Sequence, residues 1–147
     1  MSWKKLNRHL ATVMGLGNIS NAPGTVAAFG AALVYYFFPV VSHPLLILLV
    51  FITGVLSCEL EGKRSGIKDD STLVIDEIAG MWLSFIFLEK ITLLHVGLGF
   101  LLFRLFDIWK PFIIGKSQKF QGGLGVMIDD ILAAVPANLI LRLFLLI

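Results

Sequence analysis

Residues 69–82 read DDSTLVIDEIAGMW and place two carboxylates, Asp76 and Glu77, one turn into a stretch that is otherwise apolar. A carboxylate at the centre of a membrane helix costs about 2.5–3.5 kcal/mol on insertion scales, and less near the interface. Gly80 lies four residues after Asp76 on the same helical face, and it leaves room for another backbone or a ligand. The pair therefore indicates a functional site, and the alternative is two acids that snorkel to the membrane surface.

The whole chain has the composition of a membrane protein. Of its 147 residues, 57% are hydrophobic and 15% are charged, and the mean hydropathy is +0.89. Five apolar stretches of about 15–18 residues approach the roughly 20 that a helix needs to cross a bilayer; they are 25–41, 44–58, 73–88, 91–106 and 131–147. The sequence predicts a single domain, 1–147, folded as an all-α polytopic membrane helical bundle of about 4–5 spans.

The charges between these stretches predict the orientation of the bundle. Lys and Arg gather in alternate segments, which contain Lys4, Lys5 and Arg8, then Lys63, Arg64 and Lys68, then Lys110, Lys116 and Lys119. By the positive-inside rule these segments are cytoplasmic, and the basic N-terminal segment is expected to lie against the membrane. Most acids fall at the same cytoplasmic ends, namely Asp69, Asp70, Asp76, Glu77, Asp107, Asp129 and Asp130. We therefore expect the functional site to face the cytoplasm.

A second motif, FRLFDIWKP at 103–111, carries Arg104, Asp107 and Lys110 at a spacing of three. On a helix these side chains form one polar stripe, and Pro111 is expected to end the helix. An arginine fork and a lysine point charge next to an acid suit a site for phosphate and metal. The alternative is an intrahelical ion pair at the membrane surface.

A third motif, QGGLGVMIDD at 121–130, places three glycines before Asp129 and Asp130. Glycines can turn backbone amides toward an anion, so this run could form a phosphate-binding loop. It lacks the spacing and the Lys-Ser or Lys-Thr of a Walker A motif, which argues against nucleotide binding. The two acids could instead be ordinary caps in the first turn of the last helix.

Together the three motifs predict a chemistry that none of them establishes alone. Acids from three helices offer hard oxygen ligands for Mg2+, and the neighbouring cations can neutralise a phosphoryl group. A site at the membrane interface would act on a lipid with a phosphorylated head group. Charged residues gathered at one end of the spans argue against the alternative of a small membrane transporter with interfacial carboxylates, which should carry them near mid-span. A structural subunit would need no such convergence.

Other function classes find little support in the sequence. A net charge of +2 is too small to indicate binding of nucleic acid. The single cysteine, Cys58, excludes an internal disulfide and a thiolate metal site. CELEGKRS at 58–65 has the Cys-x5-Arg spacing of cysteine-dependent phosphatases. Its two glutamates would line a loop meant to hold an anion, which argues against that interpretation.

The three motifs, together with NAPGTVAA at 21–28, resemble the signature blocks of the phosphatidylglycerophosphatase A family, in the same order and with similar spacing. The resemblance implies a magnesium-dependent, multi-pass enzyme of the bacterial cytoplasmic (inner) membrane. Its substrate would be phosphatidylglycerophosphate, from which it would release the terminal phosphate during phosphatidylglycerol biosynthesis. Two departures concern only packing: Phe112-Ile113 where many members have a second proline, and Ala133-Ala134 where a glycine commonly stands.

The resemblance also implies roles for individual residues. The predicted metal ligands are Asp69, Asp76, Glu77, Asp129 and Asp130. The predicted catalytic acids are Asp76, Glu77, Asp107, Asp129 and Asp130. Arg104, Lys110 and Thr25 are predicted to bind the substrate phosphate. Several alternatives stay open: a carboxylate or a water held by the metal as nucleophile, one or two metal ions, another lipid phosphate as substrate, and the oligomeric state.

Overall fold

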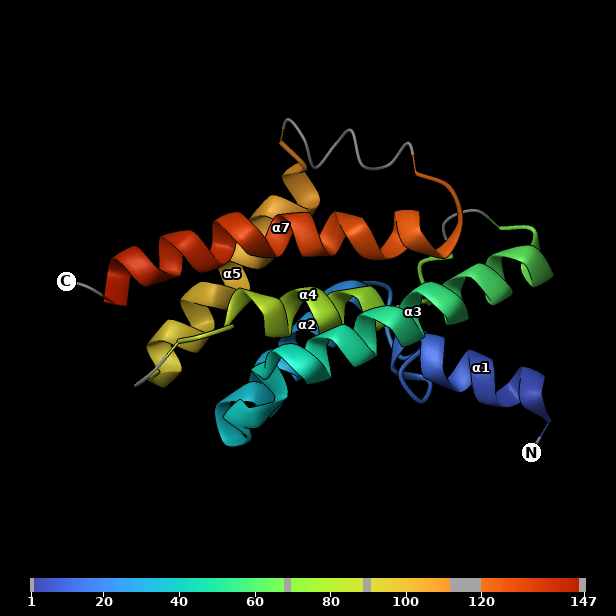
Figure 1. Ribbon diagram of the computed structural model, residues 1–147, viewed down its shortest axis with the longest axis horizontal. Helices are drawn as coiled ribbons and strands as arrows, with labels where there is room; N and C mark the ends of the chain where they lie inside the picture. The colour runs from blue at the N-terminus through green and yellow to red at the C-terminus, as the bar shows by residue number, and fades with distance from the viewer. Residues whose placement is uncertain (1, 68–69, 89–90, 112–119, 146–147) are drawn as a thin grey trace.

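The computed structural model describes residues 2–67, 70–88, 91–111 and 120–145, and the regular secondary structure in this part of the chain is entirely helical (Figure 1). The helices are α1 (Trp3–Ala11), α2 (Pro23–Phe37), α3 (Pro44–Ser65), α4 (Ile75–Ser84), α5 (Leu93–Trp109) and α7 (Gly122–Leu145), with short 3-10 turns η1 (Leu16–Asn18) and η2 (Pro39–Ser42). Helix α7 packs along α3, α4 and α5, and α4 lies between α7 and α2. The prediction of an all-α fold is confirmed for these residues.

Two of the differences between the observed helices and the predicted spans change the architecture. Helix α4 has ten residues, so it rises about 15 Å, half of the roughly 30 Å hydrocarbon core of a bilayer. The stretch 73–88 therefore does not form one crossing helix. Helix α7 begins at Gly122 and has 24 residues, so the glycine run is the start of the helix and not a loop before it.

Side chains of α7 explain why α4 ends at Ser84. The Nδ2 of Asn138 donates to the carbonyls of Ser84, at 2.9 Å, and Ile86, at 3.1 Å. Arg142 donates to the same Ile86 carbonyl, at 2.9 Å, and to Asn138 Oδ1, at 2.8 Å. Carbonyls at a helix end need such partners when water is absent. The two side chains thus stabilise a helix end inside the bundle.

We expect Asn138→Ala to lower the free energy of unfolding by about 1–2 kcal/mol, because two carbonyls beside a buried side chain would lose a donor. The measurement is thermal unfolding in detergent. Leu139→Ala is the matched control, since Leu139 is 58% exposed and adjacent in the same helix. An equal loss in both variants would contradict the capping role.

The helices approach closely because small residues line their contacts. Alanines of α2 and α7 are fully or almost fully buried in the core; they are Ala27, Ala28, Ala31, Ala32, Ala133, Ala134 and Ala137. At Gly80 a Cβ would lie 2.9 Å from the backbone oxygen of Asp130. The prediction that Gly80 admits a neighbouring backbone is therefore confirmed, and the contact brings the acids of α4 and α7 together.

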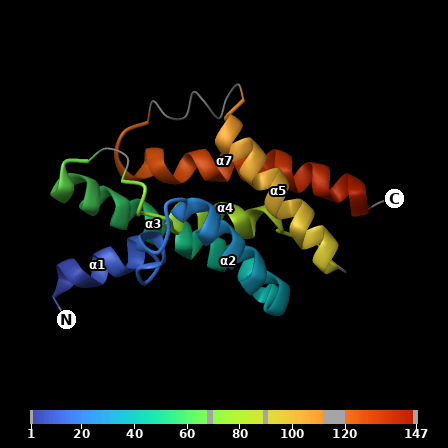
Figure 2. The same ribbon diagram turned by 180° about the vertical axis from the view of Figure 1, so that it is seen from behind.

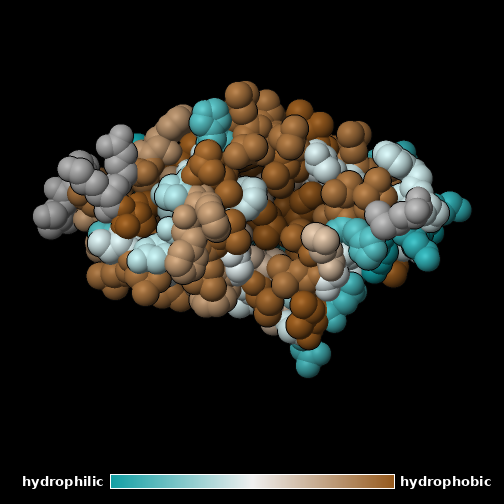
Figure 3. Space-filling model, turned by 90° about the horizontal axis from the view of Figure 1, so that it is seen from below, coloured by the Kyte–Doolittle hydropathy of each residue, from teal (hydrophilic) through white to brown (hydrophobic). Residues whose placement is uncertain are grey.

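The outer surface is unusually apolar. Helices α3 and α7 are long and apolar enough to cross a membrane, and only 28% and 44% of their apolar windows are buried inside the protein. Exposed leucines on α3 include Leu45, Leu49 and Leu56, which are 60–69% exposed. Figure 3 shows a largely hydrophobic face with the hydrophilic residues gathered mainly toward one end. The number of spans stays a prediction.

Candidate active site

One cavity of about 640 Å³ collects nearly all the residues that the sequence singled out. It lies where α2 and α4 begin, where α5 ends and beside the first turns of α7. Its lining includes Thr25, Asp76, Glu77, Arg104, Asp107, Lys110, Asp129 and Asp130. Asp69 lies outside the described residues. The predicted convergence of acids and cations is therefore found in the structure for every described residue of the set.

Three of the acids form a compact group. Asp76, Glu77 and Asp130 each offer one oxygen, and these oxygens lie within 4.8 Å of one another. Each residue also has a buried oxygen without a hydrogen-bond partner in the described part of the chain. Carboxylates held this close repel each other unless a cation or a shared proton lies between them. Because these oxygens are buried, the acids do not snorkel to the membrane surface. Three carboxylate oxygens at this spacing suit a hard divalent cation such as Mg2+.

The cations of the cavity pair with the two remaining acids. Arg104 donates to Asp107, and Lys110 donates to Asp129 at 2.7 Å and lies 3.9 Å from Asp107. The Arg104 and Asp107 side chains are only 15% and 12% exposed. Burial lowers the pKa of Lys110, but its hydrogen bond to Asp129 and the surrounding acids raise that pKa above its ordinary value. The polar stripe thus faces the cavity, and Lys110 keeps its positive charge there.

The first turn of α2 closes one side of the cavity. Gly24 packs so closely against Glu77 that a Cβ would lie 2.0 Å from Glu77 Oε1 and 3.5 Å from Arg104 Nη1. Thr25 is exposed at the same rim. A helix N-terminus carries partial positive charge, which favours an acid such as Glu77 nearby. The sequence indicated Thr25 in this segment, but only the fold reveals how closely Gly24 approaches Glu77.

The glycine run has a different role from the predicted one. The Gly123 amide donates to Glu59 Oε2 at 2.8 Å, and a Cβ at Gly123 would lie 1.9 Å from the Val55 carbonyl oxygen. Gly122 and Gly123 therefore let α7 pack against α3, and the prediction of a loop is wrong because the run is the first turn of a helix. Asp129 and Asp130 lie in the third turn of α7, so the cap alternative is wrong too.

A polar network beside the cavity was not predicted from the sequence. Arg8 donates to Asp70 at 3.1 Å and to Thr72 at 3.0 Å, and it also pairs with Glu61. Asn7 donates to the same Glu61 at 2.9 Å. Glu61 is 2% exposed, but it belongs to the charged segment CELEGKRS at 58–65, so the sequence carries no signal of its burial. The network ties α1 to α3 and to the loop before α4, where Asp70 lines the cavity.

The network predicts a pH dependence of stability. Burial raises the pKa of Asp70, but hydrogen bonds from Thr72 and Arg8 outweigh it and leave the pKa below its ordinary value. Asp70 thus stabilises the fold fully above about pH 4, the ordinary aspartate pKa, and this contribution is lost as the pH falls through the lower folded-state value. We expect Asp70→Asn to flatten the fall in melting temperature between about pH 6 and about pH 3. An unchanged profile would contradict this role.

Cys58 is buried, with 3% of its surface exposed. Arg64, the arginine of the Cys-x5-Arg spacing, pairs with Glu61 at 3.4 Å. The segment 58–65 is the end of helix α3 and not a loop. This geometry agrees with the sequence argument against a cysteine-dependent phosphatase.

Comparisons with known proteins agree with the geometry of the cavity. The family profile described as Phosphatidylglycerophosphatase A matches residues 9–145. The Escherichia coli protein named phosphatidylglycerophosphatase A is 35% identical over 86% of this chain and 76% of its own length. The Haemophilus influenzae protein of the same name is 32% identical over 89% and 83%. A Bacteroides thetaiotaomicron protein, provisionally named phosphatidylinositol-3-phosphatase, is 32% identical over 86% and 85%.

No solved structure matches this chain. The family match covers all the described cavity residues, from the first turn of α2 to the acids of α7. The relatives that share the family name are named as phosphatases, which makes this chain an enzyme of that class. The chain belongs to the phosphatidylglycerophosphatase A family.

Proposed function

We propose that this enzyme removes the terminal phosphate from phosphatidylglycerophosphate to give phosphatidylglycerol, and that the reaction requires Mg2+. The observation that carries the proposal is one cavity in which three close carboxylates, Asp76, Glu77 and Asp130, face two cations. Metal-assisted phosphoryl transfer needs that combination of metal ligands and phosphate-neutralising groups. The names of two relatives supply the lipid substrate.

The acids have distinct roles in this proposal. Asp76, Glu77 and Asp130 would hold Mg2+, and Asp69 and Asp129 are further candidate ligands. Bound there, Mg2+ supplies positive charge that stabilises the charge developing on a transferring phosphoryl group. Asp107, held by Arg104, lines the same cavity and would serve as a further ligand or orient the attacking water. The proposal that these acids bind Mg2+ is supported by their buried carboxylate oxygens, which lack a hydrogen-bond partner among the described residues.

The cations and the rim of the cavity would bind the substrate. Arg104 offers a planar fork for two phosphate oxygens, and Lys110 offers a mobile point charge. Asp107 and Asp129 hold both cations at the cavity wall, so that binding a phosphate requires little rearrangement. The Thr25 hydroxyl at the rim would donate to the phosphate or to the head group.

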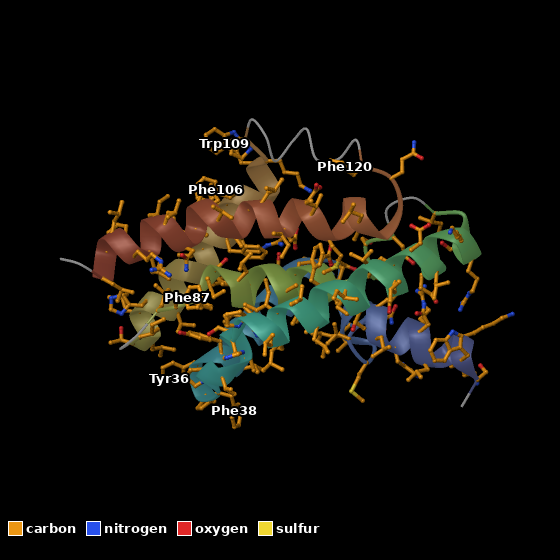
Figure 4. All side chains as sticks on the ribbon, in the orientation of Figure 1. Tyr36, Phe38, Phe87, Phe106, Trp109 and Phe120 are labelled. Atoms are coloured by element: carbon orange, nitrogen blue, oxygen red, sulfur yellow. The ribbon has the colours of Figure 1, made fainter. Side chains whose placement is uncertain are left out.

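We further propose that the enzyme is a multi-pass protein of the bacterial inner membrane, with the cavity toward the cytoplasm. Exposed apolar faces on α3 and α7 support this location. Figure 4 shows Tyr36, Phe38 and Phe87 at one side of the bundle, and Phe106, Trp109 and Phe120 at the opposite side. These two groups lie across the width of the bundle, transverse to the long axis of α7, and they add aromatic side chains to two of its flanks. The positive-inside pattern favours the cytoplasm for the side with the cavity.

The test is phosphate release by the purified protein in detergent micelles, with Mg2+ and with a chelator. We expect Mg2+-dependent release from phosphatidylglycerophosphate that exceeds release from phosphatidic acid and from phosphatidylinositol 3-phosphate. If the enzyme preferred phosphatidylinositol 3-phosphate, the proposed substrate would be wrong, and the activity named for the Bacteroides relative would replace it. No release from any lipid phosphate by folded protein would contradict the proposed reaction.

A further inference from the structure

Helix α1 presents three different faces. Asn7 and Ala11 are buried against the bundle, where Asn7 donates to the Ser57 carbonyl and to Glu61 of α3. Trp3, Leu6 and Leu10 are 72%, 36% and 41% exposed, and spacings of three and four place them in one stripe. Figure 2 shows α1 beside α3, at the periphery of the bundle. The apolar stripe therefore has no partner in the described part of the chain.

The remaining face of α1 is basic. Lys4 and Lys5 are exposed, whereas the charge of Arg8 is paired with Glu61 and Asp70 of the bundle. An apolar stripe with Trp and Leu beside a Lys-rich flank is the pattern of a helix that lies in a membrane interface. Each Lys or Arg near an anionic bilayer surface strengthens the attraction. The charge of α1 thus complements anionic lipid head groups.

We infer that α1 docks on the surface of an anionic bilayer, with Trp3, Leu6 and Leu10 among the lipids and Lys4 and Lys5 at the head groups. Met14 and Ile19, in the segment after α1, are also 90% and 71% exposed. A lipid surface accounts for both the apolar stripe and the unbalanced positive charge. The inference goes beyond the proposed reaction, because its test does not depend on activity.

The docked helix would fix the depth of the cavity relative to the bilayer surface. Arg8 of α1 donates to Asp70 and Thr72, and the Val74 amide donates to the Ala11 carbonyl at 3.0 Å. Asp70 lines the cavity, and Asp76 follows in the first turn of α4. A rigid link thus joins the membrane-facing helix to the carboxylate group. Docking of α1 would hold the cavity at the level of lipid head groups.

Nitroxide labels on the full chain in nanodiscs test the inference. Single cysteines replace Leu6, Leu10, Lys5 or His9 in a Cys58→Ala background, and collisions with oxygen and with a water-soluble nickel complex are compared. We expect an oxygen-to-nickel ratio several times higher at positions 6 and 10 than at 5 and 9. Equal and high nickel accessibility at all four positions would overturn the inference. Circular dichroism checks that each labelled protein keeps its helices.

Two further measurements show which part of the inference fails if the expected result is not obtained. A label at Leu49, which is 64% exposed on α3, reports whether the bundle itself lies in lipid; water exposure at this position would contradict the membrane location and the docking together. Lys4→Gln combined with Lys5→Gln should raise nickel accessibility at position 10 in discs that contain phosphatidylglycerol. No response to the double change, nor to removal of the anionic lipid, would contradict the charge complementarity.

Discussion

Asp76→Asn is expected to lower the rate of phosphate release by at least about a hundredfold while the protein stays folded. Asp76 belongs to the group of three carboxylates whose oxygens lie within 4.8 Å of one another. An amide is a poor magnesium ligand and removes one negative charge, so the electrostatic stabilisation of the transition state should be largely lost. The measurement is phosphate release at saturating Mg2+, together with helix content by circular dichroism.

The same change should raise stability when Mg2+ is absent. Three close carboxylates repel each other, and the amide removes part of that repulsion, so the melting temperature in chelator should rise. Added Mg2+ should stabilise the wild type and have little effect on the variant. Asp70→Asn is the matched control, because Asp70 also lines the cavity but pairs with Arg8; that variant should be destabilised. Near-normal activity of Asp76→Asn would remove this residue from the site.

The sequence predicted most of the residues that line the cavity, because residues at helix ends on the same side of the membrane must lie near one another. Helices α2, α4 and α7 begin, and α5 ends, around one cavity. Acids such as Asp76 and Asp107, placed near such helix ends, must then come close together. The spacing of Arg104, Asp107 and Lys110 also indicated correctly that they share one helical face.

Contacts between distant residues explain what the sequence did not reveal. The apolar residues after Ser84 suggest a longer helix, but Asn138 and Arg142 bind the carbonyls that end α4. The glycines near Gly123 suggest a loop, but Glu59 of α3 accepts from the first turn of α7. Local patterns cannot report these partners, because each lies more than fifty residues away along the chain.

Gly24→Ala is expected to reduce activity by about tenfold to a hundredfold, because catalysis is sensitive to displacements of about 1 Å. The new methyl group would lie 2.0 Å from Glu77 Oε1 and 3.0 Å from Glu77 Cδ. The end of a glutamate side chain can rotate away, so the fold survives. Glu77 would then leave its place beside Asp76 and Asp130. The measurements are phosphate release over a range of Mg2+ concentrations and thermal unfolding.

Gly30→Ala is the matched control for this substitution. Both glycines lie in α2, neither has a positive φ, and a Cβ at Gly30 would meet nothing within 4 Å. Alanine is the better helix former by about 1 kcal/mol, so Gly30→Ala should keep full activity and gain some stability. For Gly24→Ala we expect a higher Mg2+ requirement as well as a lower rate, because the displaced carboxylate is a proposed metal ligand. If both variants were equally active, Glu77 would tolerate displacement, and its proposed role as a metal ligand would have to be abandoned.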